Sequence, residues 1–116
     1  MLNKKSENLL ILWTTDNKDT ALHMVFMYAE NAKINGWWKD ITLLIWGASS
    51  NLVTRDKDIQ NYIDILHKSG VRIIACQQCA ENLNVVEILK KHKIEVFYTG
   101  RFLSDWLKSD LKILTI

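Results

Sequence analysis

The chain has 116 residues, of which 48% are apolar and 24% are charged, with 15 Lys and Arg against 13 Asp and Glu. These proportions exclude a disordered chain, which needs low apolar content and a high net charge. The length predicts a single domain over residues 1–116. Because the chain contains no proline, it is not collagen-like, carries no polyproline ligand motif and has no cis-proline turn.

A net charge of +2 and a pI near 8.5 give no case for nucleic-acid binding, since domains that bind nucleic acids usually have a basic stripe and a pI above about 9. The longest apolar run covers residues 9–13 and is far shorter than the roughly 20 residues that span a membrane. We therefore expect a cytoplasmic protein with neither a nucleic-acid nor a membrane partner. In a reducing compartment, two cysteines are more typical of reactive or metal-binding groups than of a structural disulfide.

Strand and helix patterns alternate along the chain. Continuous apolar runs predict buried strands, and apolar spacing of i, i+3, i+4 and i+7 predicts amphipathic helices. The first helix is capped by Asp16 or Asn17, and Gly36, Gly70 and Asn84 are expected to end helices. The expected order is strand 8–15, helix 16–35, strand 41–46, loop 47–54, helix 56–69, strand 71–75, helical turn 77–83, a helix from about 85, strand 94–98, helix 102–108 and strand 111–116.

This alternation predicts an α/β fold with a parallel sheet that is covered on both faces. In open parallel sheets, ligands bind beyond the carboxyl ends of the strands. Four strand-end loops are therefore the expected site. The residues that we expect to line a pocket there are Thr14, Thr15, Asp16, Trp46, Gly47, Ser49, Gln77, Gln78, Thr99 and Gly100.

Cys76 and Cys79 form a Cys-x-x-Cys motif directly after the third strand. A helix that begins at Gln77 favours the thiolate of Cys76, because the positive end of the helix dipole stabilises the anion. Cys79 lies one turn further on and can approach Cys76. The motif indicates either a nucleophilic thiol with a resolving partner or two small apolar residues that fill the strand–helix junction.

Other chemistries fit the sequence less well. A tetrahedral zinc site needs four ligands, whereas the chain has one cysteine pair and three histidines without paired spacing. A Cys-x-x-Cys motif near a βαβ unit also suggests a thioredoxin-like dithiol. Thioredoxins place a cis-proline beside these cysteines, whereas this chain contains no proline. A phosphate loop for a flavin or a nucleotide would have to lie in residues 14–20. This segment contains no glycine, and Asp16 and Asp19 would repel a phosphate. We therefore expect no metal and no cofactor, and we interpret Ser49 and Ser50 as loop or cap residues whose hydroxyls can donate to an anionic sulfur species.

Three further features each allow two interpretations. Residues 90–93, Lys-Lys-His-Lys, indicate an anion-binding patch or the solvated last turn of a helix, where cations oppose the negative dipole end. Trp37 and Trp38 indicate an oligomer contact or packing at a helix–strand corner. Trp46 either forms the wall of a pocket beside Cys76 or belongs to the core.

Several segments resemble the DsrE/DsrF-like proteins. These proteins show a strand with a Thr-rich turn, a long helix, Gly-Trp-Trp, a strand that ends in Ile-Trp-Gly, and Ala-Cys-x-x-Cys-Ala after the third strand. The chain departs from the family at Asn84, where relatives usually have glycine, although Asn tolerates the left-handed conformation. The matching segments are residues 11–15, 24–32, 36–38, 44–48 and 71–83.

The resemblance implies a three-layer α/β/α sandwich with a mainly parallel five-stranded sheet, and assembly as a homo-oligomer, either a trimer or a hexamer. Sulfur-relay members of the family carry a persulfide on one cysteine, and the matching position is Cys76. The resulting hypothesis is a sulfur carrier or sulfurtransferase that exchanges sulfur with donor and acceptor proteins, with Cys79 in an assisting role. The alternatives are a small-ligand-binding or assembly module and a dithiol redox protein.

Overall fold

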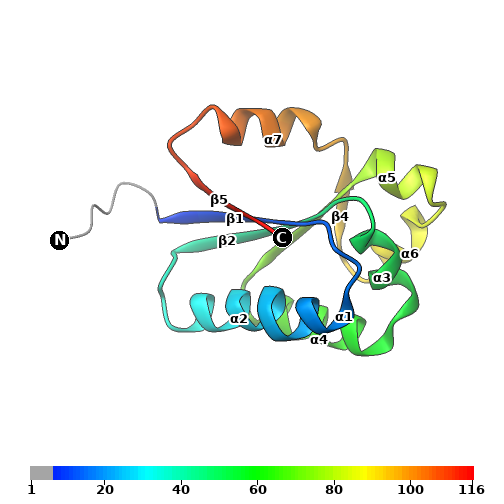
Figure 1. The fold of residues 1–116 in the computed structure, drawn as a ribbon, viewed down its shortest axis with the longest axis horizontal. Helices are drawn as coiled ribbons and strands as arrows, with labels where there is room; N and C mark the ends of the chain where they lie inside the picture. The colour runs from blue at the N-terminus through cyan, green and yellow to red at the C-terminus, as the bar shows by residue number, and fades with distance from the viewer. Residues whose placement is uncertain (1–6) are drawn as a thin grey trace.

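Strands and helices alternate along the chain in the computed structural model, which describes residues 7–116 (Figure 1). The strands are β1 (Asn8–Trp13), β2 (Asp40–Ile45), β3 (Arg72–Cys76), β4 (Glu95–Phe97) and β5 (Lys112–Thr115). The helices are α1 (Lys18–Thr20), the π-helical η1 (Ala21–Phe26), α2 (Met27–Ile34), α3 (Ser49–Arg55), α4 (Lys57–Ser69), α5 (Gln77–Asn82), α6 (Val86–Lys91) and α7 (Gly100–Leu107).

The five strands form one parallel sheet in the order β4-β3-β2-β1-β5. Leu43 pairs with Ile11 on one side and with Ile73 on the other, and this buried row faces the larger part of the core. The next row along the strands contains Leu44 and Ile74, which face the opposite side. Apolar side chains on both faces account for the continuous apolar runs in the strand sequences.

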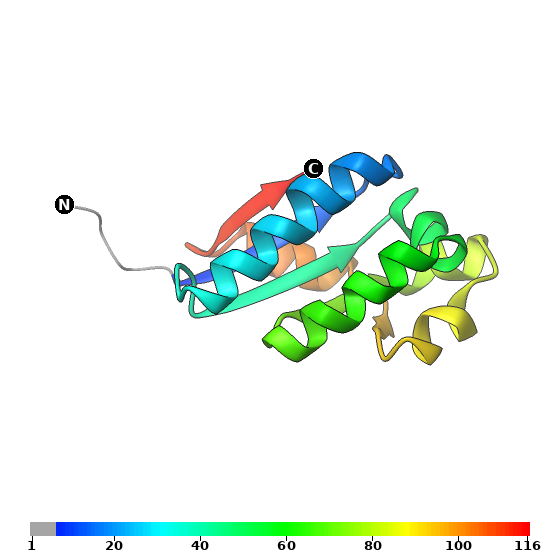
Figure 2. The same ribbon diagram turned by 90° about the horizontal axis from the view of Figure 1, so that it is seen from below.

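Helices cover both faces of the sheet, so the expected three-layer α/β/α fold is confirmed. Figure 1 shows α7 alone above the sheet, while α1, α2 and α4 lie below it. Figure 2 shows α2 and α4 side by side, crossing the strands from below, and the two helices are in contact. No helix within residues 7–116 is long and apolar enough to cross a membrane.

The first long helix begins where the sequence predicts and contains a segment that the sequence does not reveal. Asn17 caps it, since its side-chain oxygen accepts a hydrogen bond of 2.8 Å from the backbone N–H of Thr20. The middle segment, η1, is a π-helix, and it buries Val25 and Phe26 next to each other. The Phe26 ring meets the Trp13 ring edge-on, with 5.0 Å between the ring centroids. This contact ties the helix to the end of β1.

Trp37 and Trp38, in the corner after α2, differ in burial. Trp38 is half-buried, and its indole N–H donates to the Tyr28 hydroxyl at 3.0 Å. Trp38 therefore packs in the helix–strand corner, which is the second of the two interpretations. Trp37 is 61% exposed, and its part in an oligomer contact stays a prediction.

The prediction of a loop over residues 47–54 is wrong, because α3 occupies most of this segment. Ser, Ser and Asn in sequence are typical of a loop, but Ser49 and Ser50 are fully buried and begin the helix. Leu52 and Val53 point into the core, and two apolar residues are too few to show a helical period. Asp56 then separates α3 from α4 and caps α4.

Candidate functional site

The carboxyl ends of β1 and β2 are joined by the first turn of α3. The Ser49 hydroxyl donates to the Trp13 carbonyl at 2.7 Å and accepts from the Trp46 backbone N–H at 3.2 Å. The Ser49 backbone N–H donates to the Thr14 carbonyl at 3.2 Å. Ser49 is therefore a structural bridge between two strand ends, and its hydroxyl is fully engaged.

Cys76 is the last residue of β3 and also the N-cap of α5. Its sulfur accepts a hydrogen bond from the backbone N–H of Cys79, with an N···S distance of 3.5 Å. The backbone of Cys76 is extended, so its side chain turns back over the first turn of the helix. Cys76 is only 4% exposed, whereas Cys79 is half-buried, and both are free thiols.

Cys79 lies between the end of β2 and Cys76. Burial raises the pKa of the Cys79 thiol, the backbone N–H of Gly47 lowers it in part, and a hydrogen bond with Cys76 raises it again. A raised pKa keeps the Cys79 proton in place near neutral pH.

Gly47 makes the contact with Cys79 through an unusual backbone conformation. Its φ of +74° lies in the left-handed region, which glycine adopts at little cost. The Gly47 backbone N–H donates to the Cys79 sulfur. The Ile-Trp-Gly end of β2 and the cysteine pair therefore belong to one site.

Two buried hydroxyls without partners flank the strand that carries Cys76. In the described part of the chain, the buried side-chain atoms without a hydrogen-bond partner are Trp13 Nε1, Ser50 Oγ and Thr99 Oγ1. Ser50 follows β2 and Thr99 follows β4, and these strands are the two neighbours of β3. An unpaired buried hydroxyl costs free energy, and both residues are fully buried.

Other predicted pocket residues are engaged elsewhere. The Thr14 hydroxyl donates to the Ile116 carbonyl at 3.1 Å, and the Thr15 hydroxyl accepts from the Asn17 backbone N–H at 3.1 Å. Asp16 lies 3.7 Å from the Arg55 guanidinium. These three residues cap and brace the first helix on the β1 side of the edge.

The amides of Gln77 and Gln78 also turn away from the cysteines. Each donates along the helix to the residue four positions later, Gln77 to Glu81 at 3.3 Å and Gln78 to Asn82 at 3.0 Å. Half-buried Trp46 packs on the α7 side of the sheet, and exposed Gly100 begins α7.

Sequence reasoning missed a bond that ties β4 to the cysteine helix. The Tyr98 hydroxyl donates to both carboxylate oxygens of Glu81, at 2.9 and 3.0 Å. This hydrogen bond raises the pKa of Tyr98. No pattern in the sequence relates these two residues, because the strand order alone brings them together. No group of three or more His, Cys, Asp and Glu side chains within residues 7–116 is placed to hold a metal ion.

Comparisons with known proteins place this geometry in a family. No curated protein matches the chain. A conserved protein of unknown function from Bacteroides thetaiotaomicron, BT1422, is 47% identical in sequence, with a TM-score of 0.94 over 98% of this chain and 100% of the other.

Two more distant solved structures share the fold. The ychN protein from E. coli has 15% identity and a TM-score of 0.70 over 96% of this chain and 99% of its own. MTH1491, a protein of unknown function from Methanobacterium thermoautotrophicum, has 12% identity and a TM-score of 0.77 over 94% and 98%. The profile of the DsrE/DsrF-like family matches residues 8–115, and the chain belongs to this family.

Proposed function

We propose that this protein is a sulfur carrier in which Cys76 holds a sulfane sulfur as a persulfide and passes it to an acceptor protein. The observation that carries the proposal is the place of Cys76 at the end of β3, where its sulfur accepts a hydrogen bond from the Cys79 backbone N–H in the first turn of α5. Membership of the DsrE/DsrF-like family supports the same assignment.

The loading step is an exchange between sulfur atoms. The Cys76 thiolate attacks the outer sulfur of a donor persulfide, R–S–SH. The donor S–S bond breaks, R–S⁻ leaves, and a new S–S bond forms on Cys76. The outer sulfur keeps its proton, and the step needs no external oxidant or reductant. Delivery is the same exchange, with the acceptor thiolate attacking the outer sulfur on Cys76.

Besides delivery to an acceptor, the persulfide on Cys76 can react with Cys79. When the Cys79 thiolate attacks the inner sulfur of Cys76, the outer sulfur leaves as hydrosulfide and a Cys76–Cys79 disulfide forms. A thiol reductant must then break that disulfide before another cycle. Because burial raises the pKa of Cys79, this release is slow near neutral pH and the persulfide persists.

The buried hydroxyls of Ser50 and Thr99 support the carrier role. Both follow strands that neighbour β3, and neither has a partner in the described residues. A persulfide anion is an acceptor that would satisfy such hydroxyls. That one of these hydroxyls donates to a persulfide on Cys76 is part of the proposal, and Ser50→Ala tests it.

The test is the mass of the intact protein after incubation with a small persulfide donor. Wild type and Cys79→Ser are expected to gain the mass of one sulfur atom, whereas Cys76→Ser is not. A gain that survives in Cys76→Ser overturns the assignment. If the wild type instead loses two protons and gains no sulfur, the pair is a dithiol redox centre. If neither change occurs while a control thiol is loaded, the protein is a binding or assembly module.

A further inference from the structure

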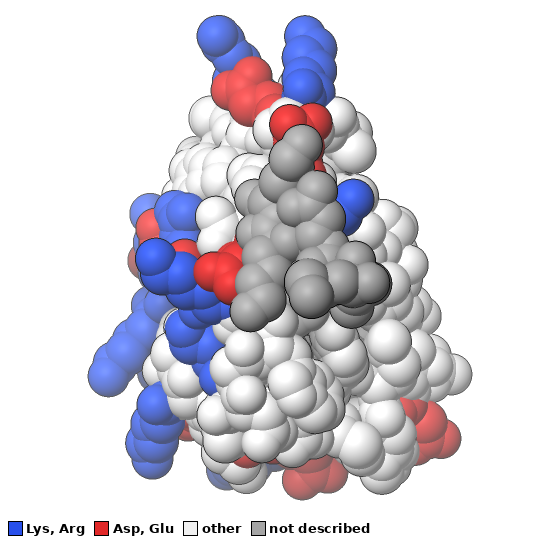
Figure 3. All heavy atoms as spheres, turned by 90° about the vertical axis from the view of Figure 1, so that its left-hand side faces the viewer, with Lys and Arg blue, Asp and Glu red and all other residues white. Residues whose placement is uncertain are grey.

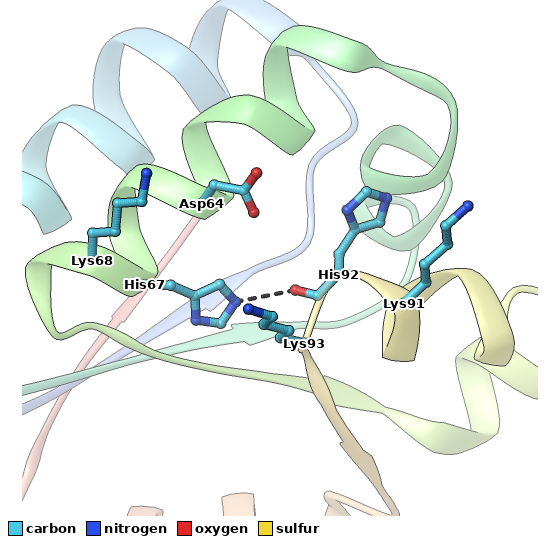
Figure 4. Close-up of a pocket in the computed structure, with 6 residues that line it drawn as sticks. All are labelled: Asp64, His67, Lys68, Lys91, His92 and Lys93. Atoms are coloured by element: carbon cyan, nitrogen blue, oxygen red, sulfur yellow. Dashed lines mark hydrogen bonds between the residues drawn. The ribbon is translucent and has the colours of Figure 1, made fainter.

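A basic hollow of about 380 Å³ lies where the last turns of α4 and α6 approach each other (Figure 4). Such a volume falls within the range of small-molecule sites, about 300–1,000 Å³. The hollow contains both charged and imidazole side chains. Its lining residues are Asp64, His67, Lys68, Lys91, His92 and Lys93.

The basic hollow is at the opposite end of the sheet from the cysteines. The helix α4 ends at Ser69, just before β3 begins at Arg72, and α6 ends at Lys91, just before β4 begins. Both helix ends therefore lie at the amino edge, while Cys76 is the last residue of β3 at the carboxyl edge. Figure 3 faces the end of the molecule where β1 starts, and Lys and Arg side chains gather along the left of that view.

Within residues 7–116, the basic hollow carries more positive than negative charge. It contains three ammonium groups and one carboxylate, that of Asp64. The ion pairs within residues 7–116 include neither this carboxylate nor Lys68, Lys91 or Lys93. Three unpaired cations around one concave surface produce a positive potential that attracts anions.

The lysines are also not needed to cap the two helices. In α4, the Gly70 and Val71 backbone N–H groups donate to the last-turn carbonyls at 3.1 and 3.0 Å. In α6, the Lys93 and Ile94 backbone N–H groups do the same at 2.9 and 3.2 Å. The negative dipole ends are therefore satisfied by the backbone, and the ammonium groups remain available to a ligand.

A histidine holds the two sides of the basic hollow together. The His67 ring extends from α4 to the turn after α6, where Nε2 lies 3.2 Å from the His92 carbonyl oxygen (Figure 4). Because a carbonyl only accepts, Nε2 carries the proton in this contact. The bond fixes the distance between the helix ends, so the hollow is preformed.

We infer that the basic hollow binds a small polyvalent oxyanion of the phosphate or pyrophosphate class. Lysine ammonium groups on flexible stems can each reach a different oxygen of such an ion. The described residues that line the hollow include no Trp, Tyr or Phe, so the side chains recognise the charged group rather than a nucleobase. The ligand is either a free oxyanion or the phosphate chain of a larger molecule.

The test is calorimetric titration of the full chain with pyrophosphate at low salt. We compare wild type with Lys91→Gln/Lys93→Gln and with the control Lys108→Gln/Lys112→Gln, which removes the same charge at two exposed positions, directly after α7 and at the start of β5. Two lost charge-assisted hydrogen bonds weaken binding at least about tenfold in the first variant. The control stays within about twofold of wild type, as expected for screened charges outside the site.

A second titration with adenosine triphosphate distinguishes the two sources. Tighter binding of pyrophosphate identifies a free oxyanion, and tighter binding of the nucleotide identifies a phosphate chain on a larger molecule. Absence of saturable binding to either, or an equal loss in both double variants, overturns the inference. Circular dichroism checks that each variant is folded. Cys76→Ser is expected to bind pyrophosphate like wild type, so this test is independent of the sulfur proposal.

Discussion

Two neighbouring serines at the start of α3 have opposite surroundings. The Ser49 hydroxyl joins Trp13 and Trp46 at the ends of two strands, whereas the buried Ser50 hydroxyl has no partner among residues 7–116. Ser49→Ala is expected to lower the free energy of unfolding by about 1–3 kcal/mol, because it removes the buried hydrogen bonds that the hydroxyl makes to the Trp13 carbonyl and with Trp46. Ser50→Ala is expected to leave stability unchanged or to raise it.

Urea unfolding of both variants measures this difference. The same Ser50→Ala protein is expected to lose its persulfide faster than wild type, since the hydroxyl is proposed to donate to the sulfur anion. A Ser50→Ala variant that is less stable than Ser49→Ala, and that keeps its persulfide as long as wild type, would contradict both expectations.

Sequence alone was sufficient to place Cys76 at the end of β3, but it was not sufficient to describe the surroundings of the neighbouring side chains. Cys76 could be placed because an apolar run ends there and helix-forming residues follow. Ser50 and Thr99 could not be distinguished from Ser49, because a hydroxyl gives no sign in the sequence of whether its partner is present. Gln77 and Gln78 adjoin the cysteine in sequence, but their amides bond along the helix instead.

At the scale of the secondary-structure elements, Gly70 ends α4 in the left-handed conformation, with φ of +94°. A Cβ at this position would meet Lys33 Cε at 3.0 Å, and this flexible side chain can move. Gly70→Ala is therefore expected to lower the free energy of unfolding by about 1–2 kcal/mol, mainly through backbone strain. Gly100→Ala is the control, since nothing lies within 4 Å of its Cβ.

In Gly100→Ala, alanine in the first turn of α7 is expected to raise stability by up to about 1 kcal/mol. Thermal unfolding of the two variants checks the pair. Equal effects of both substitutions would show that the conformation of Gly70 does not matter to α4.

The cap of α4 predicts a pH dependence. The Ile59 backbone N–H and the Lys18 ammonium hold the pKa of Asp56 below its ordinary value. Because the folded-state pKa is lowered, the stabilisation is complete above the unfolded-state value of about 3.9 and is lost as the pH falls through the folded-state value. Asp56→Ala is expected to cost about 1 kcal/mol at pH 7.

Urea unfolding of wild type and Asp56→Ala from pH 7 to pH 2.5 follows this effect. The difference in free energy is expected to shrink below about pH 4, as the carboxyl gains its proton. A difference that stays constant over the whole range would mean that the charge of Asp56 does not contribute to the cap.

The long amphipathic α4 was predicted nearly to its ends, because the sequence shows its apolar period and has Asp56 and Gly70 at its two ends. The short α3 and the π-helical η1 were not. Their conformations depend on which strand ends they contact. These are tertiary contacts, which local sequence patterns do not show.

For the whole molecule, alternation of strands and helices was enough to predict a parallel three-layer fold, but not the strand order. That order puts Ser50 and Thr99 after the two strands that neighbour β3, and it brings Tyr98 to the cysteine helix. It also joins His67 and His92, which are 25 positions apart, in the basic hollow at the other edge. The molecule therefore has two candidate sites, one at each end of the same strands.

The carrier role of Cys76 is tested most directly by locating the sulfur. After loading with a small persulfide and alkylation, trypsin releases residues 73–90 as one peptide that contains both cysteines, and tandem mass spectrometry separates their positions. We predict an alkylated persulfide on Cys76 and an alkylated thiol without extra sulfur on Cys79. Extra sulfur on Cys79 alone, or on neither cysteine while a control thiol is loaded, would contradict the assignment.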